Sequence, residues 1–510
     1  MNEKKEKQFM KIVTALDNDS VVGKSEKLVK LMKNKVTADQ GWEFVYDVKK
    51  DAYQIKSASD KELVLTWTDE DFIRVNPNES KDEQYWVLED DNDGYVFIHN
   101  KKNYNLVLDV DQANTNEGTR IKVTEKHKDP SLPIKAQKFT LQMSNWSKEG
   151  SFQAINFLKA WLTDSEKSAY MGFQHYPDEQ NQVWNDVYWK RNGTNNHGQD
   201  KFLFLMYKLD DDRVVIVNRQ TGEVLEHVYW DEKETSVVLR PYNGKENQVF
   251  RKLNIPEWNT FKLLVDNDKR IVGVQDDKVL SRTKITSLDT EKHKDNDYTR
   301  LFLNDNGTKD KKISLPSLFP PGELGPIPEL TGFNDLLPEN EDAKRVVIGS
   351  ELIPGILVND SLTLADRIKK NPYYILEYRQ YWHLLWSDVF TAGSKKIKTE
   401  LTGISEGAQE KMKELIGASI CTDIGLKFVD KSEPFGKQIT SGLTVLHSCN
   451  DELGETTTIT DVENPNDFTV KYARYARAHE FVLKDSTGKV VGDPWIAVDE
   501  NDMYLKMFKK

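Results

Sequence analysis

The chain has 510 residues, 30% of them charged, and a formal net charge of −12. This length predicts two to four domains, and so acidic a chain repels a phosphate backbone, which argues against nucleic acid as a partner. No run of 18 apolar residues is present, which excludes a helical membrane span.

The amino terminus, Met1–Lys7, is charged and lacks the apolar core of a secretory signal. We therefore expect a protein that either stays in the cytoplasm or leaves the cell by another route, such as lysis or deposition in a crystal.

Residues 1–147 are rich in short alternating strands separated by turn signals, a pattern typical of an all-β sandwich or barrel. A weak repeat runs through this region at spacings of 44 and 53 residues: Gln40-Gly41-Trp42, Gln84-Tyr85-Trp86 and Gln137-Lys138-Phe139. These motifs resemble the repeat of the ricin-B β-trefoil. That resemblance implies three lobes, with the aromatic residue of each motif packed in the core.

Residues 148–308 are interpreted as a second, degenerate β-trefoil. Its lobes end at Gln199-Asp200-Lys201-Phe202, at Gln248-Val249-Phe250 and near Leu301-Phe302, and only the middle motif matches well. A turn at Asn218–Gly222 is expected to join the strands at 213–217 and 236–239.

Trefoils of the ricin type bind sugars through an acid early in a lobe, a stacking aromatic, and an amide just before the Gln-x-Trp motif. In the first domain, Asp109 occupies the acid position, but Val123 and Ala136 replace the other two. The middle lobe of the second domain retains more of the set: Glu226, Asn247, and Arg240 or Tyr242 near the stacking position. The alternative is that both trefoils are structural and their sugar sites have decayed.

Residues 309–345 hold a cluster of prolines between Pro316 and Pro338. This composition predicts an extended, semi-rigid linker without a helix or central strand. We place the main domain boundary here.

Residues 346–510 form the last predicted domain. The segments 351–360 and 371–382, the latter reading Asn-Pro-Tyr-Tyr-Ile-Leu-Glu-Tyr-Arg-Gln-Tyr-Trp, resemble the Bin-like, or Tpp, family of insecticidal crystal proteins, and the resemblance continues to about Pro494. It implies an elongated, aerolysin-type β-sheet domain that forms pores, in a protein made in the bacterial cytoplasm. Family members usually carry one trefoil, whereas this chain is predicted to carry two.

A candidate membrane-inserting hairpin runs from Ile420 to Cys449, about a turn at Glu433–Gly436. Side chains alternate across a strand, so a register that pairs Ser432 with Lys437 gives one apolar and one mainly polar face. The apolar face consists of Ile424, Leu426, Phe428, Ile439, Leu443 and Val445. Each arm is about as long as a tilted strand that crosses a bilayer. The hairpin either lies on the surface of a soluble protein or joins copies of itself in a membrane barrel.

Other motifs in the chain do not support catalysis or metal binding. Gly403-Ile404-Ser405-Glu406-Gly407 matches a nucleophile elbow, but no parallel sheet precedes it, and Ser405 is a better start for a helix. No zinc spacing, phosphate loop or dinucleotide motif is found. We therefore expect no catalytic residues, no metal and no cofactor.

These observations lead to one main hypothesis and two alternatives. The main one is a pore-forming toxin of the insecticidal type: its trefoils bind a glycan or glycoprotein receptor on a gut cell, and it then forms a homo-oligomer and inserts into the target membrane, alone or with a second toxin component. The alternatives are a non-lytic lectin or inhibitor, and a glycan-active enzyme, which the lack of a paired-carboxylate motif disfavours.

Overall fold

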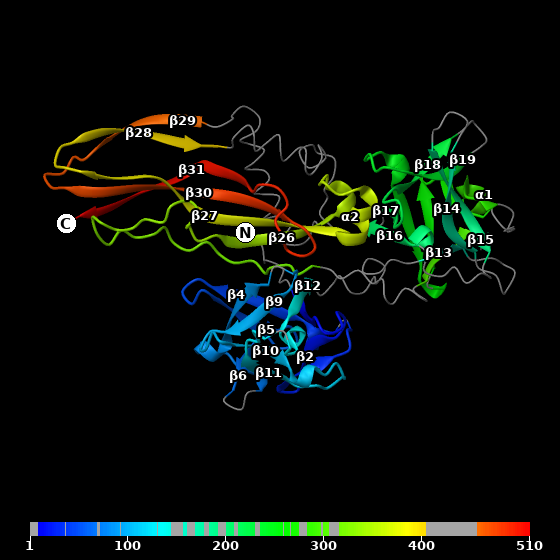
Figure 1. The fold of residues 1–510 in the computed structure, drawn as a ribbon, viewed down its shortest axis with the longest axis horizontal. Helices are drawn as coiled ribbons and strands as arrows, with labels where there is room; N and C mark the ends of the chain where they lie inside the picture. Colours follow the sequence, from blue (N-terminus) through cyan, green and yellow to red (C-terminus); the bar gives the residue numbers. More distant parts are fainter. Residues whose placement is uncertain are drawn as a thin grey trace.

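In the computed structural model, the described residues are 9–35, 37–68, 72–91, 93–129, 131–143, 157–160, 169–177, 183–191, 200–208, 213–229, 235–258, 260–265, 267–274, 283–296, 299–304, 316–403 and 456–509. Nearly all of their regular structure is β, which confirms the predicted all-β class (Figure 1). The described α-helices are α1 (Thr290–His293) and α2 (Leu364–Lys370). No helix in this part of the chain has the length and hydrophobicity that crossing a membrane requires.

The first domain is a β-trefoil. Strands β1, β4, β5, β8, β9 and β12 pair in a closed ring, which leaves none of these six with a free edge. The other strands form three hairpins, β2–β3, β6–β7 and β10–β11. The strands are β1 (Met10–Thr14), β2 (Val21–Ser25), β3 (Leu28–Met32), β4 (Trp42–Asp47), β5 (Ala52–Ser57), β6 (Leu63–Trp67), β7 (Ile73–Pro77), β8 (Tyr85–Asp90), β9 (Val96–Asn100), β10 (Leu106–Val110), β11 (Ile121–Glu125) and β12 (Phe139–Met143).

The Gln-x-aromatic repeat closes each lobe of this trefoil. In the middle lobe, the Oε1 atom of Gln84 accepts from the N–H of Glu79, and its Nε2 donates to the carbonyl of Pro77, both at 2.8 Å. Gln40 and Gln137 bond to their own loops in the same way. These amides satisfy loop backbone groups that no strand pairs. The aromatic residues of the motifs, Trp42, Trp86 and Phe139, are fully buried, as the resemblance implied.

The second domain repeats this topology. Barrel strands β13, β16, β17, β20, β21 and β25 show five of the six ring pairings of the first domain, and the hairpins are β14–β15, β18–β19 and β22–β24. The strands are β13 (Phe157–Ala160), β14 (Ala169–Pro177), β15 (Val183–Arg191), β16 (Phe204–Lys208), β17 (Arg213–Asn218), β18 (Val224–Tyr229), β19 (Thr235–Arg240), β20 (Phe250–Ile255), β21 (Thr260–Val265), β22 (Arg270–Gly273), β23 (Thr283–Lys284), β24 (Thr286–Asp289) and β25 (Leu301–Asn304).

Two local predictions for this domain need correction. The turn at Asn218–Gly222 joins β17 to β18 and not to the strand at 236–239. In the first lobe, Phe204 and not Phe202 takes the place of the core aromatic, because Phe204 begins β16 as Trp42 begins β4. Phe202 ends the preceding 3₁₀ turn, where the three lobes of the first domain and the middle lobe of the second have glutamine.

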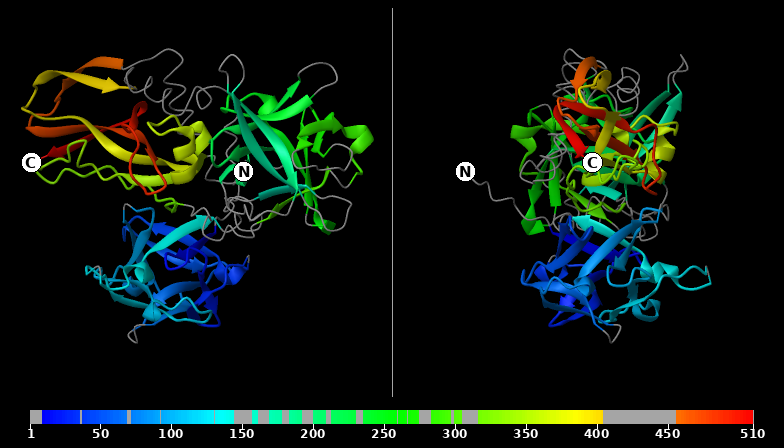
Figure 2. Two further views of the ribbon diagram at one scale, coloured as in Figure 1. Left: turned by 45° about the vertical axis from the view of Figure 1, so that its right-hand side comes forward. Right: turned by 90° about the vertical axis from the view of Figure 1, so that its left-hand side faces the viewer.

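The third domain contains a long antiparallel sheet in the order β26-β27-β30-β31 and a separate pair, β28–β29. Its strands are β26 (Val346–Pro354), β27 (Tyr373–Phe390), β28 (Lys395–Thr402), β29 (Thr456–Glu463), β30 (Val470–Lys484) and β31 (Trp495–Lys509). Strand β27 has 18 residues, so it spans about 60 Å at the rise of an extended chain. The sheet extends well beyond the trefoils, away from α2 (Figures 1 and 2).

The proline-rich segment is extended, as predicted, and residues 316–345 contain no helix or strand. It does not hold the domains apart. The N–H of Leu318 donates to the carbonyl of Leu141 in the first trefoil, and the N–H of Gly322 donates to the carbonyl of Val347 in β26. Trp382 of β27 also donates its indole N–H to the carbonyl of Gly325, at 2.9 Å. The segment therefore ties the first trefoil to the long sheet.

Candidate functional site

Asp109, the acidic residue predicted to bind sugar in the first trefoil, is hydrogen-bonded within its own lobe. Asp109 is 4% exposed, and its carboxylate accepts from the Oγ1 of Thr124 at 3.0 Å. Thr124 in turn accepts from Nε2 of Gln137, at 2.7 Å. The acid is therefore part of the bonding that closes its lobe.

Three of the four sugar-binding residues predicted in the second trefoil have partners within that domain: Glu226 and Arg240 bond each other, and Tyr242 is packed. Glu226 is 4% exposed; it accepts from Arg240 at 3.1 Å and from Nε2 of Gln248 at 2.7 Å. Tyr242 packs against a hydrophobic cluster, and burial raises the pKa of its hydroxyl. Asn247 differs, because it lines a cavity bounded by β17, β18, β20 and β21.

The predicted inserting hairpin, with Ile424, Leu426, Phe428, Ile439, Leu443 and Val445, lies outside the described residues, as does Ser405. Strand β28, which ends at Thr402, precedes the hairpin in the chain, and β29, which begins at Thr456, follows it. Strand β28 is bonded to β27 through two of its lysines, and β29 pairs with β28. Asp388 accepts from Lys396 at 2.8 Å and from Lys398 at 2.5 Å. Burial would raise the pKa of Asp388, but these two hydrogen bonds outweigh it and lower the pKa to about 2.

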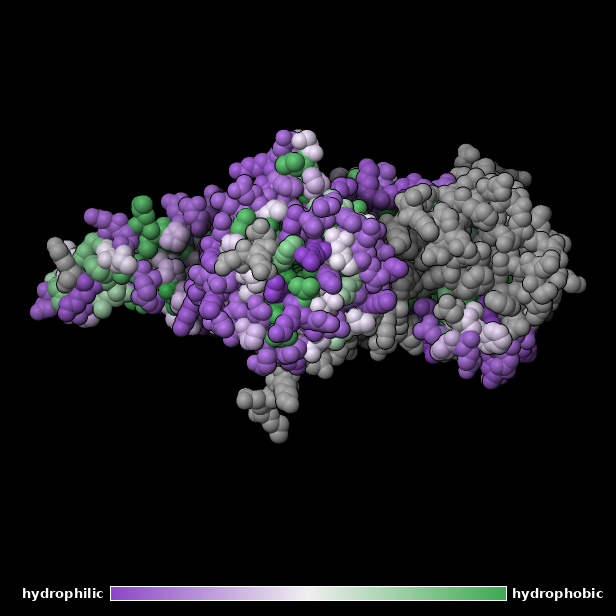
Figure 3. Space-filling view, turned by 90° about the horizontal axis from the view of Figure 1, so that it is seen from below, coloured by the Kyte–Doolittle hydropathy of each residue, from purple (hydrophilic) through white to green (hydrophobic). Residues whose placement is uncertain are grey.

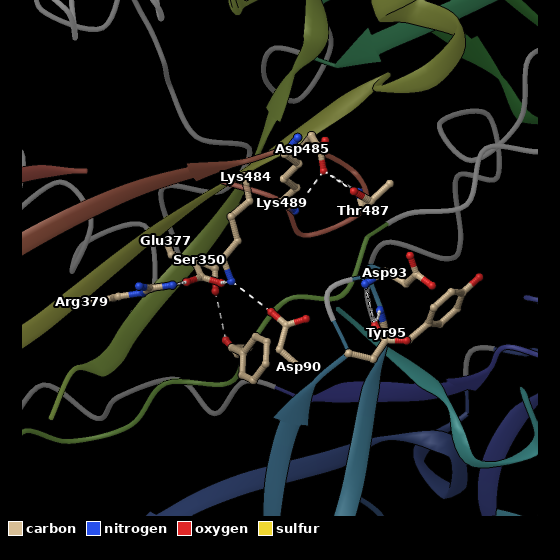
Figure 4. A network of polar contacts seen from close by, with 12 residues as sticks. Asp90, Asp93, Tyr95, Ser350, Glu377, Arg379, Lys484, Asp485, Thr487 and Lys489 are labelled. Atoms are coloured by element: carbon tan, nitrogen blue, oxygen red, sulfur yellow. Dashed lines mark hydrogen bonds and ion pairs between the residues drawn. The ribbon is translucent and has the colours of Figure 1, made fainter. Parts of the chain in front are cut away.

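A chain of ion pairs joins the first trefoil to the long sheet (Figure 4). At the end of β30, the Nζ of Lys484 lies 3.1 Å from Asp90 of the trefoil and 2.7 Å from Glu377 of β27. Glu377 also bonds Arg379 at 2.6 Å. Lys484 is 7% exposed and Glu377 1%, so this contact lies well inside the interface.

The second trefoil meets the third domain at the start of β27. The hydroxyl of Tyr207 donates to the carbonyl of Pro372, and its ring lies edge-on to Tyr373 with centroids 5.2 Å apart. Gly222, at φ +74°, approaches the backbone of Leu364 so closely that a Cβ would lie 2.4 Å from it. A side chain at position 222 would therefore separate the two domains.

Comparison with known proteins identifies the family of the chain. Binary larvicide subunit BinB of Lysinibacillus sphaericus is 34% identical over 316 residues, which cover 59% of this chain and 69% of BinB. This chain belongs to the Bin family of larvicide subunits. BinA of the same organism is also 34% identical, over 58% of this chain and 78% of BinA. The family described as ricin-type beta-trefoil lectin domain-like matches residues 38–124. Among solved structures, Cry35Ab1 aligns over 70% of this chain and 90% of its own, with 17% identity and a TM-score of 0.49.

Sequence reasoning missed the interface residues of this Bin-family protein. The one available signal was the presence of charges within apolar strand sequences, such as Glu377 and Arg379 after Ile375-Leu376, and Lys484 after Phe481-Val482-Leu483. Buried charges are rare unless paired. The pattern therefore indicates partners, although it does not name Asp90.

Proposed function

We propose that this Bin-family chain is an insecticidal toxin subunit that binds a carbohydrate-bearing receptor on gut cells of larvae, assembles with copies of itself, and inserts a β-hairpin into the membrane. The observation that carries the proposal is the 34% sequence identity with BinB and with BinA, two larvicide subunits, over more than half of the chain. The ricin-type trefoil supports the receptor class, because this family is described as lectin-like.

The surfaces of the domains support separate roles, with ligand binding in the first trefoil and membrane contact in the domain of the long sheet. The face of the first trefoil that points away from the sheet is mainly hydrophilic, as expected of a domain that meets its ligands in water (Figure 3). The long sheet carries the two strands that flank the predicted hairpin. Ile397, Leu401 and Ile459 on the outer face of these strands are 45–72% exposed. Such an apolar face next to the hairpin favours later contact with lipid or with another copy.

A second toxin component and a non-enzymatic mode of action are parts of the same proposal. BinA and BinB are both named as subunits of a binary larvicide, which favours a two-protein toxin for this chain as well. Toxicity would then come from membrane damage and not from turnover of a substrate.

Feeding and binding assays with the full-length protein test this function. Labelled protein should bind gut-cell membranes of susceptible larvae, and the chain, alone or with a second larvicide subunit, should kill them. Free glycans from those membranes should compete for binding. If the folded protein neither binds the membranes nor harms larvae of any tested order, the proposal is wrong.

A further inference from the structure

The second trefoil contains a cavity of about 650 Å³ between its middle and third lobes. This volume lies within the roughly 300–1,000 Å³ typical of small-molecule sites. Of the residues predicted to bind sugar, Asn247 alone lines the cavity, and Glu226, Arg240 and Tyr242 do not. The cavity therefore shares Asn247 with the sugar site that the sequence predicted and differs from that site in its other residues.

Asn247 presents a hydrogen-bond acceptor that lacks a partner. Its Nδ2 donates to the carbonyl of His227 at 3.1 Å. Because a carbonyl only accepts, this bond fixes the amide orientation and turns Oδ1 away from His227. The Oδ1 atom is buried and has no partner among the described residues. Leaving such an atom unpaired is unfavourable, and a hydroxyl donor bound in the cavity would satisfy it.

Tyr229 supplies an aromatic surface to the same cavity. It is the last residue of β18, and its side chain is 52% exposed. Its ring meets the His227 ring edge-on, with centroids 4.7 Å apart and an interplanar angle of 83°, and this contact orients it. An exposed aromatic ring beside an amide matches the apolar face and hydroxyl edge of a pyranose.

The charges around the cavity are balanced. Arg251 forms a two-pronged ion pair with Asp268, with N–O distances of 2.8 and 2.6 Å. Asp268 has a left-handed backbone (φ +67°) in the turn after β21, a conformation that aspartate tolerates. Arg213 and Glu246 add one further charge of each sign. With two cations and two anions, the cavity does not favour an acidic ligand.

We propose that this cavity binds a short neutral oligosaccharide. A sugar hydroxyl donates to Oδ1 of Asn247, and the apolar face of one pyranose stacks on Tyr229. The assignment rests on the proposed function, since it identifies the ligand class of a receptor-binding trefoil. It also gives the second trefoil, which the ricin-type match at residues 38–124 does not reach, a role of its own.

A glycan array probed with the full-length protein, followed by calorimetric titration of the strongest neutral glycan, tests the proposal. Asn247→Ala and Tyr229→Ala should each weaken binding at least about tenfold, whereas Tyr229→Phe, which keeps the ring, should bind as the wild type does. Tyr104→Ala is the matched control, because Tyr104 of the first trefoil is 51% exposed; it should leave affinity unchanged. Thermal unfolding confirms that each variant is folded, and the exposed position of Tyr229 keeps the test usable if Asn247→Ala does not fold.

Two results would overturn the assignment. One is unchanged affinity in both Asn247→Ala and Tyr229→Ala, and the other is a wild-type protein that captures only sialylated or sulfated glycans, or none. Membrane binding and larval killing by the same proteins separate this failure from failure of the proposed function. A wild type that kills larvae without binding neutral glycans contradicts the ligand of this cavity and leaves the toxin assignment standing.

Discussion

Replacing Lys484 with methionine should loosen the first trefoil from the long sheet. The substitution keeps the aliphatic stem and removes the ammonium that lies 2.7 Å from Glu377, 3.1 Å from Asp90 and 5.7 Å from the ring of Phe319. Glu377 keeps its ion pair with Arg379 in this variant, so the loss should be that of a hydrogen bond to a charged group, about 1.5–3 kcal/mol. Most of this loss should arise at Glu377, whose side chain is 2% exposed, since that of Asp90 is 25% exposed and partly solvated.

Hydrogen exchange followed by mass spectrometry measures this loss locally, which suits a protein of three domains that need not unfold as one unit. Peptides from the end of β30 and from residues 316–322 should exchange about one to two powers of ten faster in Lys484→Met than in the wild type. Lys489→Met is the matched control, because Lys489 lies exposed in the following turn, and it should exchange normally. Rates within about threefold of the wild type in Lys484→Met would refute the reasoning that this ion pair holds the interface.

Three further predictions concern the other domains. Asp388→Asn should free β28 from β27 at neutral pH at a loss of about 1–2 kcal/mol, seen as faster amide exchange in β28. The pKa of the wild-type carboxylate is lowered from 3.8 to about 2, so the wild type should lose the same protection only as the pH falls from about 4 to about 2. Loss of protection in the wild type at pH 6 would contradict this prediction. Lys11→Met should stabilise the first trefoil by about 1–3 kcal/mol at pH 7 in thermal unfolding, because burial lowers the pKa of Lys11 from 10.5 to about 8. The wild type therefore carries the full free-energy cost of the buried ammonium below about pH 8 and loses this cost as the pH rises to about 10.5. A destabilised variant would show that the bond to Asn34 outweighs burial. Leu443→Arg should abolish dye release from vesicles while receptor binding persists, since arginine facing lipid near the midplane costs about 2–4 kcal/mol; release at the wild-type rate would exclude the hairpin as the inserting element.

The trefoil fold was predictable because its repeat has a local cause. Gln40, Gln84, Gln137 and Gln248 each bond to a loop a few residues upstream in the chain, so their spacing is visible in the sequence. The prediction misplaced the aromatic of the second domain's first lobe because Phe202 stands where the motif has glutamine, and an apolar residue there carries no loop-closing signal.

The candidate sites were less predictable because they depend on contacts between distant residues. Glu226 was recognised as an acid, but its bonds to Arg240 and Gln248 assign it to the scaffold. The cavity beside Asn247 combines side chains from β17, β18, β20 and the turn after β21, and no spacing in the sequence brings these together. Asp90 and Lys484 are 394 residues apart, and neither has a local pattern that identifies its partner.

The central claim is that this Bin-family chain permeabilises the membrane to which it binds. Release of a trapped dye from vesicles made with larval gut membranes tests it most directly, with the amount of bound protein measured in the same sample. We predict release that rises more steeply than linearly with bound protein, as assembly of several copies requires, after protease or pH activation and with or without a second larvicide subunit. Full binding of the wild-type protein with no dye release under any of these treatments would contradict the account.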